Sequence, residues 1–309
     1  MTEFISGLPN CALRNAWLTI GNFDGVHRGH QALIQSLNQR TAARSGQSVV
    51  LTFWPHTRIV LGYSSEPFLL TTLQEKNRQL QAAGADVVVT LTFNQSLADM
   101  PAEAFLEQVA SAIQPVGLLV GPQFRIGKGR QADFAFVRNF YELRGIECES
   151  VPAFELKGQR VSSNRVRACL SEGRVDEAAE LLGRPFSLEG EVRHGKHLGS
   201  KLGFPTANLT PEPMQMLPRF GVYATRVQLE GQTLVGVTSV GVRPTFESSS
   251  LPNVETLILD FDETIYDKII RIEFVSFLRP EFRFDRVEDL IAQIDEDKTQ
   301  TRRIFENGS

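Results

Sequence analysis

Two histidines close a short glycine-bounded loop near the start of the chain. Residues 21–30 read Gly-Asn-Phe-Asp-Gly-Val-His-Arg-Gly-His, which places His27 and His30 three positions apart. At that spacing both imidazoles lie on one face of a helix, and at its first turn free N–H groups and the helix dipole favour an anion. Two imidazoles directed at one phosphate can donate hydrogen bonds to oxygens that gain charge during a displacement. The pattern therefore indicates transfer of a phosphorus-containing group.

Two other interpretations of this pair remain open. The same spacing can serve a metal, although no third ligand accompanies it. Two exposed histidines at a helix start are the commonest origin of an isolated His-x-x-His. The glycine-rich surroundings favour the phosphate site, and the residues expected to contact a nucleotide there are Gly21, Asn22, Phe23 and Asp24.

A second glycine-rich segment lies far downstream. Residues 194–209 read His-Gly-Lys-His-Leu-Gly-Ser-Lys-Leu-Gly-Phe-Pro-Thr-Ala-Asn-Leu, and neither this segment nor the first is a Walker loop. A flexible turn that leads into a strand would explain most such loops. Here the expected phosphate contacts are Gly195, Lys201 and Gly203. The simplest account of two such segments is two nucleotide sites with different chemistries.

A carboxylate that could act as a base follows the second segment. Glu255 begins a strand-like stretch in which alternate positions hold Leu257, Leu259 and Phe261, so that all four side chains share one face. A carboxylate at the head of an apolar row is not typical of ordinary surface, although a strand-end glutamate in solvent is the alternative. A carboxylate in this position can remove the proton of an alcohol.

The first half of the chain supplies elements that could hold the histidine loop. Apolar strands are predicted at 16–20, 48–53, 86–93 and 116–120, and helices at 31–44, 73–83 and 102–113. Continuous apolar strands between helices predict a parallel sheet covered on both faces. The loop at 21–30 then lies at the carboxyl end of a parallel strand, where such sheets bind ligands.

The local pattern changes near residues 183–186. Strands are predicted at 221–229, 233–240, 255–261 and 268–277 without intervening helices, with a hairpin turn at Glu230 and a terminal helix from about Val287. Successive short strands predict a small closed barrel or a sandwich. The prediction is an α/β fold with two domains, a parallel-sheet domain at 1–184 and an antiparallel β-barrel domain at 185–309.

The composition limits the classes of function. The 309 residues are 42% hydrophobic, and the net charge of −4 argues against a general polyanion binder. The sequence contains no apolar run of about 18 residues, so no membrane span is predicted. Residues 1–9 lack the pattern of a secretory signal. The three scattered cysteines fit neither a disulfide framework nor a metal site. A reducing cytoplasm is the expected location.

The histidine loop resembles the signature of the flavin-nucleotide adenylyltransferases within the nucleotidyltransferase superfamily. That resemblance implies a Rossmann-like domain and a second motif at a later helix start, which Val-Ser-Ser-Asn-Arg-Val-Arg at 161–167 fits. It implies that Ser162 and Ser163 contact phosphate and that Arg167 holds the departing pyrophosphate. The segment 121–130 resembles a further loop of that family and carries Arg125, suited to flavin or phosphate. Its departures from the family pattern are Gln123, Ile126 and Ala132, and the second motif departs at Asn164.

Residues 204–209 resemble the Pro-Thr-Ala-Asn motif of riboflavin kinases. The resemblance implies that Thr206 and Asn208 give oxygen ligands to a Mg²⁺ that bridges the phosphates of ATP. It also implies that Glu255 is the catalytic base. Arg279 is an expected flavin or phosphate contact, and an ion pair at the strand end is an equal alternative.

Taken together, the chain resembles the bacterial bifunctional riboflavin kinase/FAD synthetase family over essentially its whole length. The resemblance implies that the barrel converts riboflavin and ATP to FMN and ADP, and that the first domain converts FMN and ATP to FAD and pyrophosphate. The implied partners are these small molecules and Mg²⁺, with no nucleic acid and no membrane. The oligomeric state is not indicated.

Two alternatives stay open at this point. In one, only the kinase is active and the first domain is a nucleotide-binding or regulatory relic, an alternative motivated by the departures at Gln123 and Asn164. In the other, the chain is a non-catalytic module that binds flavin or nucleic acid, although its acidic balance opposes the nucleic-acid version.

Overall fold

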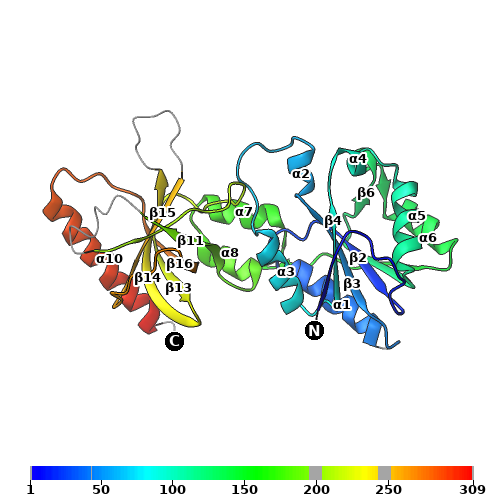
Figure 1. Ribbon diagram of the computed structural model, residues 1–309, viewed down its shortest axis with the longest axis horizontal. Helices are drawn as coiled ribbons and strands as arrows, with labels where there is room; N and C mark the ends of the chain where they lie inside the picture. The colour runs from blue at the N-terminus through cyan, green and yellow to red at the C-terminus, as the bar shows by residue number, and fades with distance from the viewer. Residues whose placement is uncertain (1, 43, 195–203, 243–251, 308–309) are drawn as a thin grey trace. The chain divides into compact units, whose positions relative to one another are not determined.

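The computed structural model describes residues 2–42, 44–194, 204–242 and 252–307 (Figure 1). The chain forms two compact units, Met1–Ser163 and Asn164–Ser309. Within the described ranges, no helix is both long enough and apolar enough to cross a lipid bilayer.

The first unit is built on a six-stranded sheet in the order β1-β4-β3-β2-β5-β8. Every neighbouring pair of these strands is parallel, which confirms the predicted parallel sheet (Figure 1). The strands are β1 (Glu3–Ser6), β2 (Trp17–Ile20), β3 (Ser48–Trp54), β4 (Val87–Thr92), β5 (Gly117–Val120) and β8 (Glu147–Ser150), with short pairs formed by β6 (Arg125–Ile126) and β7 (Ala132–Asp133) and by β9 (Glu155–Leu156) and β10 (Gln159–Arg160).

Helices cover both faces of this sheet, because alternate residues of each strand point to opposite sides. Leu18 and Leu51 belong to one buried cluster with Leu106 of α5, whereas Trp17 and Val50 belong to another that includes residues of α1 and α3. The helices are α1 (Arg28–Ala42), α2 (Thr57–Val60), α3 (Leu73–Ala82), α4 (Gln95–Ala98), α5 (Ala102–Ile113), the 3₁₀ turn η1 (Lys128–Arg130) and α6 (Phe134–Glu142).

The strand order changes direction beside β2. Strands β3 and β4 follow β2 on one side, whereas β5 and β8 lie on its other side. Ligands bind to open α/β sheets at such a reversal, beyond the carboxyl ends of the strands. The loop after β2 holds the two histidines and the loop after β5 holds Arg125, so the topology brings both predicted loops to the same edge of the sheet.

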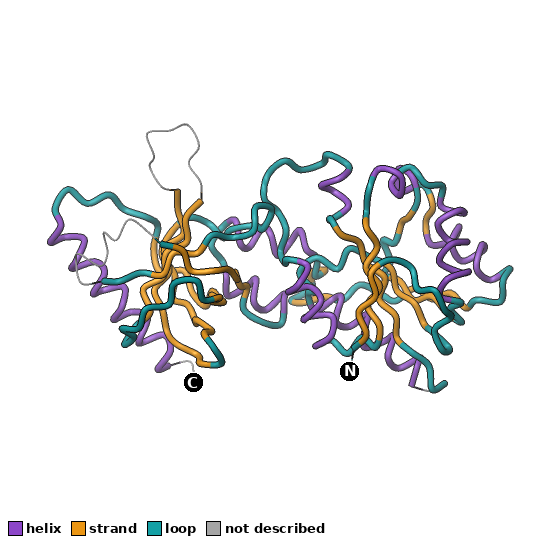
Figure 2. The backbone as a smooth tube through the Cα atoms, viewed as in Figure 1, coloured by secondary structure: helices purple, strands orange, loops and turns teal. Residues whose placement is uncertain are grey.

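The second unit contains a closed barrel in the order β11-β12-β15-β14-β13-β16. Its neighbouring strands are antiparallel, which confirms the predicted barrel, and Figure 2 shows the terminal helix alongside it. The elements are β11 (Phe186–Arg193), β12 (Ala207–Leu209), β13 (Gly221–Leu229), β14 (Gln232–Val242), β15 (Pro252–Ile258), β16 (Ile269–Arg279) and α10 (Val287–Asn307).

Turn geometry decides the ends of two barrel strands. The predicted hairpin is confirmed, since Leu229 pairs with Gln232 and the intervening Glu230 has φ +48°. The strand predicted at 255–261 ends earlier, at Ile258. Asp260 takes a left-handed backbone, φ +55°, which interrupts a strand.

Two helices precede the barrel, α7 (Ser163–Ser171) and α8 (Val175–Leu182). Helix α8 packs against β11 and β16, and the backbone N–H of Arg219 donates to the carbonyl of Leu170 at 2.8 Å. Helix α8, and all of α7 except its first residue, therefore belong to the second compact unit. A domain boundary at residues 184 and 185 stays a prediction.

Candidate active sites

The loop after β2 is tightly folded. Phe23, Gly25 and Val26 all have positive φ, at +49°, +83° and +38°. The buried Asp24 carboxylate accepts hydrogen bonds from the backbone N–H groups of Leu70 at 3.0 Å and Thr71 at 3.3 Å. Asp24 therefore anchors the loop to a distant segment, and its contact with a nucleotide stays a prediction.

His27 stands at the position that caps helix α1. Its Nδ1 accepts a hydrogen bond from the backbone N–H of His30 at 3.3 Å, and the two rings stack with centroids 3.7 Å apart. An accepting Nδ1 leaves the proton of the neutral ring on Nε2. A Cβ atom added to Gly29 would lie 3.2 Å from the His27 ring. Glycine at this helical position therefore leaves room for the capping imidazole.

His30 is a neutral imidazole near neutral pH. Burial lowers its pKa well below 6.5, and His27, Arg160 and Lys76 lower it further by charge repulsion. Its Nδ1 is buried and makes no hydrogen bond within the part of the chain that the structure describes. A neutral ring can donate one hydrogen bond without bringing a second charge to the site.

The second predicted motif meets the first through one side chain. The hydroxyl of Ser163 donates to the backbone carbonyl of Asp24 at 2.9 Å. Ser162, beside it, is half-buried. Arg167 lies on α7 in the second unit, where its Nη1 donates to Oδ1 of Asn164 at 2.8 Å. The contact through Ser163 joins the two halves of the adenylyltransferase-like signature, and the role of Arg167 stays a prediction.

The departures in the loop after β5 have a packing explanation. Ile126 and Ala132 are partners across the β6–β7 pair. Ala132 is buried, and both residues pack in the main apolar cluster of the sheet. Gln123 and Arg125 are exposed instead. Two of the departures therefore belong to the core beneath the loop, while Arg125 remains accessible to a ligand.

A buried lysine that the sequence motifs did not indicate lies at the same edge of the sheet, near the carboxyl end of β3. Lys76, in the first turns of α3, is only 3% exposed. Its Nζ donates to the carbonyl of Phe53 at 3.0 Å, to Oγ1 of Thr52 at 3.2 Å and to the carbonyl of Asn22 at 3.4 Å. The sequence does hold a signal for this lysine. Lys76 and the apolar Leu80 are four residues apart and therefore share one face of the helix, which the structure shows to be the buried face.

In the barrel, the predicted metal ligand and the predicted base lie directly across from each other. Asn208 of β12 is the register partner of Glu255 of β15. The side chain of Asn253 donates to Oε1 of Glu255 at 2.6 Å. Val254 and Thr256 are buried whereas Glu255 is half-buried, so its side chain lies on the outer face of the barrel. Thr206, just before β12, is also half-buried, and Gly195, Lys201 and Gly203 lie outside the described residues.

Two further charged residues, Arg279 and Glu281, lie at and just after the end of β16. Ser239 is the β14 partner of Glu255, and its hydroxyl donates to Glu281 at 3.1 Å, a contact not foreseen from the sequence. Arg279 forms a two-pronged ion pair with the buried Asp297, with Nε–Oδ1 at 2.9 Å and Nη2–Oδ2 at 2.7 Å. Arg279 is thus an ion-pair partner at the end of its strand, and a flavin contact by Arg279 stays a prediction.

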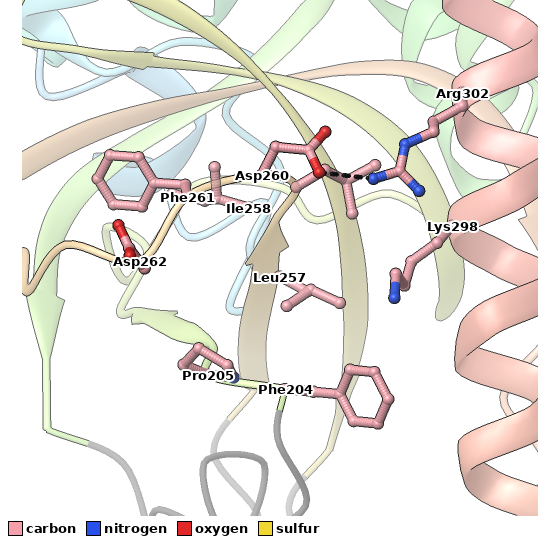
Figure 3. Close-up of a pocket in the computed structure, with 10 residues that line it drawn as sticks. Phe204, Pro205, Leu257, Ile258, Asp260, Phe261, Asp262, Lys298 and Arg302 are labelled. Atoms are coloured by element: carbon pink, nitrogen blue, oxygen red, sulfur yellow. Dashed lines mark hydrogen bonds and ion pairs between the residues drawn. The ribbon is translucent and has the colours of Figure 1, made fainter.

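A pocket of about 440 Å³ adjoins the Pro-Thr-Ala-Asn motif (Figure 3). Asp260 and Arg302 face each other at one side of it, 2.7 Å apart, and Nζ of Lys298 lies 5.2 Å from the centre of the Phe204 ring. Its lining combines apolar side chains with charged ones. The lining residues are Phe204, Pro205, Leu257, Ile258, Leu259, Asp260, Phe261, Asp262, Lys298 and Arg302.

Comparison with known proteins assigns a family to each half. A family model described as FAD synthetase matches residues 10–165, and one described as riboflavin kinase matches residues 182–305. A protein of Escherichia coli K12 is 37% identical, covering 97% of this chain and 96% of its own length. One from Haemophilus influenzae is 35% identical, with coverages of 98% and 99%. Both are named bifunctional riboflavin kinase/FMN adenylyltransferase.

A solved structure from Streptococcus pneumoniae has the same fold. It superposes with a TM-score of 0.87 at 28% identity over 97% of this chain and 98% of its own, and its title names a macrolide-efflux protein. That title describes the other protein, whereas the two domain matches and the full-length relatives agree with each other. The chain therefore belongs to the bifunctional riboflavin kinase/FMN adenylyltransferase family, and it is a transferase with a kinase domain and a nucleotidyltransferase domain.

Proposed function

We propose that the barrel phosphorylates riboflavin to FMN at Glu255 and that the first unit adenylylates FMN to FAD at the histidine loop. The observation that carries this division is a difference in residue type. Glu255 stands across from Asn208 in the barrel. The loop after β2 instead presents imidazoles, and its carboxylate, Asp24, accepts from backbone N–H groups. An alcohol needs a base, whereas a phosphate monoester is already an anion.

In the kinase step, Glu255 takes the proton of the ribityl hydroxyl. The hydroxyl oxygen forms a bond to the γ-phosphorus of ATP, the bond to the β–γ bridging oxygen breaks, and ADP leaves. The proton then passes from the carboxylate to solvent. The hydrogen bond from Asn253 fixes the orientation of the carboxylate, which favours transfer from a positioned alcohol.

Thr206 and Asn208 are the proposed ligands of Mg²⁺. A hydroxyl and an amide oxygen are hard, neutral donors, and magnesium takes few protein ligands because it keeps several waters. The position of Asn208 beside Glu255 fits this donor set. When bound, the ion neutralises charge on the phosphates of ATP. Gly195, Lys201 and Gly203 are proposed phosphate contacts from the sequence alone.

The pocket beside Pro205 is proposed to hold the base of ATP. Its volume of about 440 Å³ lies in the usual range for small-molecule sites. Leu257 and Leu259 give it apolar walls, and Pro205 immediately precedes the proposed magnesium ligand Thr206. A base held here would place its phosphates toward Thr206 and Asn208. Arg279 is kept as a proposed flavin contact, secondary to its ion pair.

In the adenylyl step, the FMN phosphate attacks the α-phosphorus of ATP and pyrophosphate leaves. His27 and His30 donate hydrogen bonds to oxygens that gain charge, without acting as bases. Gly21, Asn22 and Phe23 lie close to the nucleotide as part of the loop, and Asp24 fixes that loop. Ser162, Ser163 and Arg167 are the proposed pyrophosphate contacts, and Arg125 is the proposed contact for FMN.

Product analysis of separate variants tests this division. Purified protein with riboflavin, ATP and Mg²⁺ is expected to yield FMN and then FAD. The double change His27→Ala and His30→Ala should reduce FAD formation about 1000-fold and leave riboflavin phosphorylation within twofold. Glu255→Gln should reduce phosphorylation about 1000-fold and leave FAD formation from supplied FMN unchanged.

Two control variants alter residues of the same barrel and the same helix at positions outside the proposed sites. Glu191→Gln alters another barrel carboxylate, which pairs with Arg193. Gln35→Ala alters an exposed position of helix α1. Both should retain both activities. Equal loss of the two activities in either folded test variant would refute the two-site assignment, and wild-type protein that makes no FAD from FMN would favour the kinase-only alternative.

The cytoplasmic location stays a prediction.

A further inference from the structure

Lys76 presents an electrostatic arrangement that the proposed adenylyl step does not use. Its ammonium group is almost completely buried, and its hydrogen-bond partners are neutral oxygens of Asn22, Thr52 and Phe53. Within the described ranges of the chain, no ion pair involves this group. Burying a cation among neutral hydrogen-bond partners is costly, and the nearby Asp24 carboxylate offsets only part of that cost. Buried charged groups of this kind cluster at functional sites.

The ammonium group of Lys76 lies beside the proposed adenylylation site. Two of its acceptors lie at the carboxyl end of β3, and the third, the carbonyl of Asn22, belongs to the histidine loop. Nζ also lies 5.3 Å from the centre of the Trp54 ring, whose face favours a cation. The positive charge also acts on His30, since it contributes to lowering the pKa of that ring.

We infer that Lys76 is a positioning residue of the adenylylation site, which holds the histidine loop through Asn22 and gives it a buried positive charge for the triphosphate of ATP. This inference rests on the adenylylation site proposed above. Lys76 does not contact substrate in it. Its positive charge acts on the phosphates from behind the loop, and its hydrogen bond to the carbonyl of Asn22 holds the loop in place.

The charge of Lys76 is also sensitive to pH in an accessible range. Burial lowers its pKa from 10.5 to about 8, and the nearby Asp24 opposes that shift. Among its neighbours, His30 has a pKa well below 6.5, and Glu75 accepts from Arg78 and Gln79. Above pH 8 the lysine loses its proton. ATP bound beside it should favour the protonated form, so binding near pH 8 should take up a proton.

The first experiment uses wild-type protein. The ratio kcat/KM for FAD formation from FMN should fall above an apparent pKa of about 8, since this ratio reports groups of the free enzyme. Calorimetry of ATP binding near pH 8, in buffers of different ionisation enthalpy, should show proton uptake. A flat profile between about pH 7 and 9.5, or binding without proton uptake, would overturn the inference.

The second experiment compares two variants of one helix. Lys76→Gln should lower kcat/KM for FAD formation about 100-fold and abolish both the basic limb and the proton uptake. Arg78→Gln removes a cation from the same helix at a half-exposed position and should behave as wild type. Riboflavin phosphorylation serves as an internal control for folded protein. If Lys76→Gln does not fold, the wild-type pH profile of kcat/KM for FAD formation decides, because calorimetry of ATP binding to the wild type also reports on the barrel site.

The outcomes separate this inference from the proposed site. If the double histidine variant keeps FAD formation, the proposed location of the adenylyl step is wrong. If that variant loses FAD formation while Lys76→Gln stays within threefold of wild type with an unchanged pH profile, only the role of Lys76 is wrong.

Discussion

The two sites handle charge in opposite ways. The loop after β2 is supported by buried, nitrogen-bearing side chains, with His27 6% and Lys76 3% exposed. In the barrel, the half-buried Glu255 accepts a hydrogen bond from Asn253 and lies across from the buried Asn208 in the strand register. The first site thus offers imidazoles and a buried ammonium group, with its carboxylate, Asp24, turned to backbone N–H groups, whereas the barrel site offers the carboxylate of Glu255.

This difference follows the needs of the two attacking groups. A phosphate that is already ionised is repelled by a nearby carboxylate and benefits from donors and positive charge. An alcohol needs an acceptor for its proton, and ATP at that site needs a cation held by oxygens. In this chain the two sites therefore differ in residue type as well as in fold. The next three predictions test that contrast.

The largest expected effect in this set is at the barrel. Asn208→Ala should lower riboflavin phosphorylation about 100-fold and raise the Mg²⁺ concentration needed for half-maximal rate. FAD formation from FMN should stay within twofold, because the first unit contains none of the altered contacts. Steady-state rates over a series of Mg²⁺ concentrations measure both effects.

Gln228→Ala is the matched control for Asn208, since it removes an amide from β13 of the same barrel. It should leave the rate and the Mg²⁺ requirement unchanged. An Asn208→Ala enzyme with normal Mg²⁺ dependence would show that the amide is not a ligand and would weaken the contrast between the sites.

A smaller effect is expected from a single methyl group in the histidine loop. In Gly29→Ala the new Cβ would lie 3.2 Å from the His27 ring, so the ring must shift by a few tenths of an ångström. Such a displacement should lower FAD formation about tenfold, although alanine favours the helix by about 1 kcal/mol. Rates measured beside thermal unfolding would reveal loss of activity without loss of stability, and an unchanged rate would disconnect the ring position from the reaction.

The smallest effect concerns acid stability. Because the pKa of His30 is lowered in the folded protein, the unfolded chain binds more protons below pH 6.5, and the first unit should lose stability as the pH falls through that window. His30→Gln should show a shallower loss. Both tryptophans, Trp17 and Trp54, lie in the first unit, so their fluorescence during urea unfolding reports on it selectively. Equal slopes in the two proteins would contradict the buried, neutral state of His30.

The sequence predicted much of the fold because periodicity is a local property. The helix at 102–113 has the expected bounds, and the terminal helix begins at Val287 as expected. The strand expected to reach Phe261 stops at Ile258, because the left-handed backbone of Asp260 was not readable from alternation. Strand order, and with it the meeting of the loops after β2 and β5, depends on contacts between distant segments.

For the sites, the sequence by itself determined the residue types and the family, since the motifs are short runs of neighbours. Only the tertiary structure decided which of these groups face each other and which are buried. It placed Asn208 across from Glu255 through strand register, turned Asp24 toward Leu70, paired Arg279 with Asp297, and brought Lys76 beneath Asn22. Each of these contacts joins residues far apart in the chain, and burial lowers the pKa of Lys76 through desolvation, which no local pattern encodes.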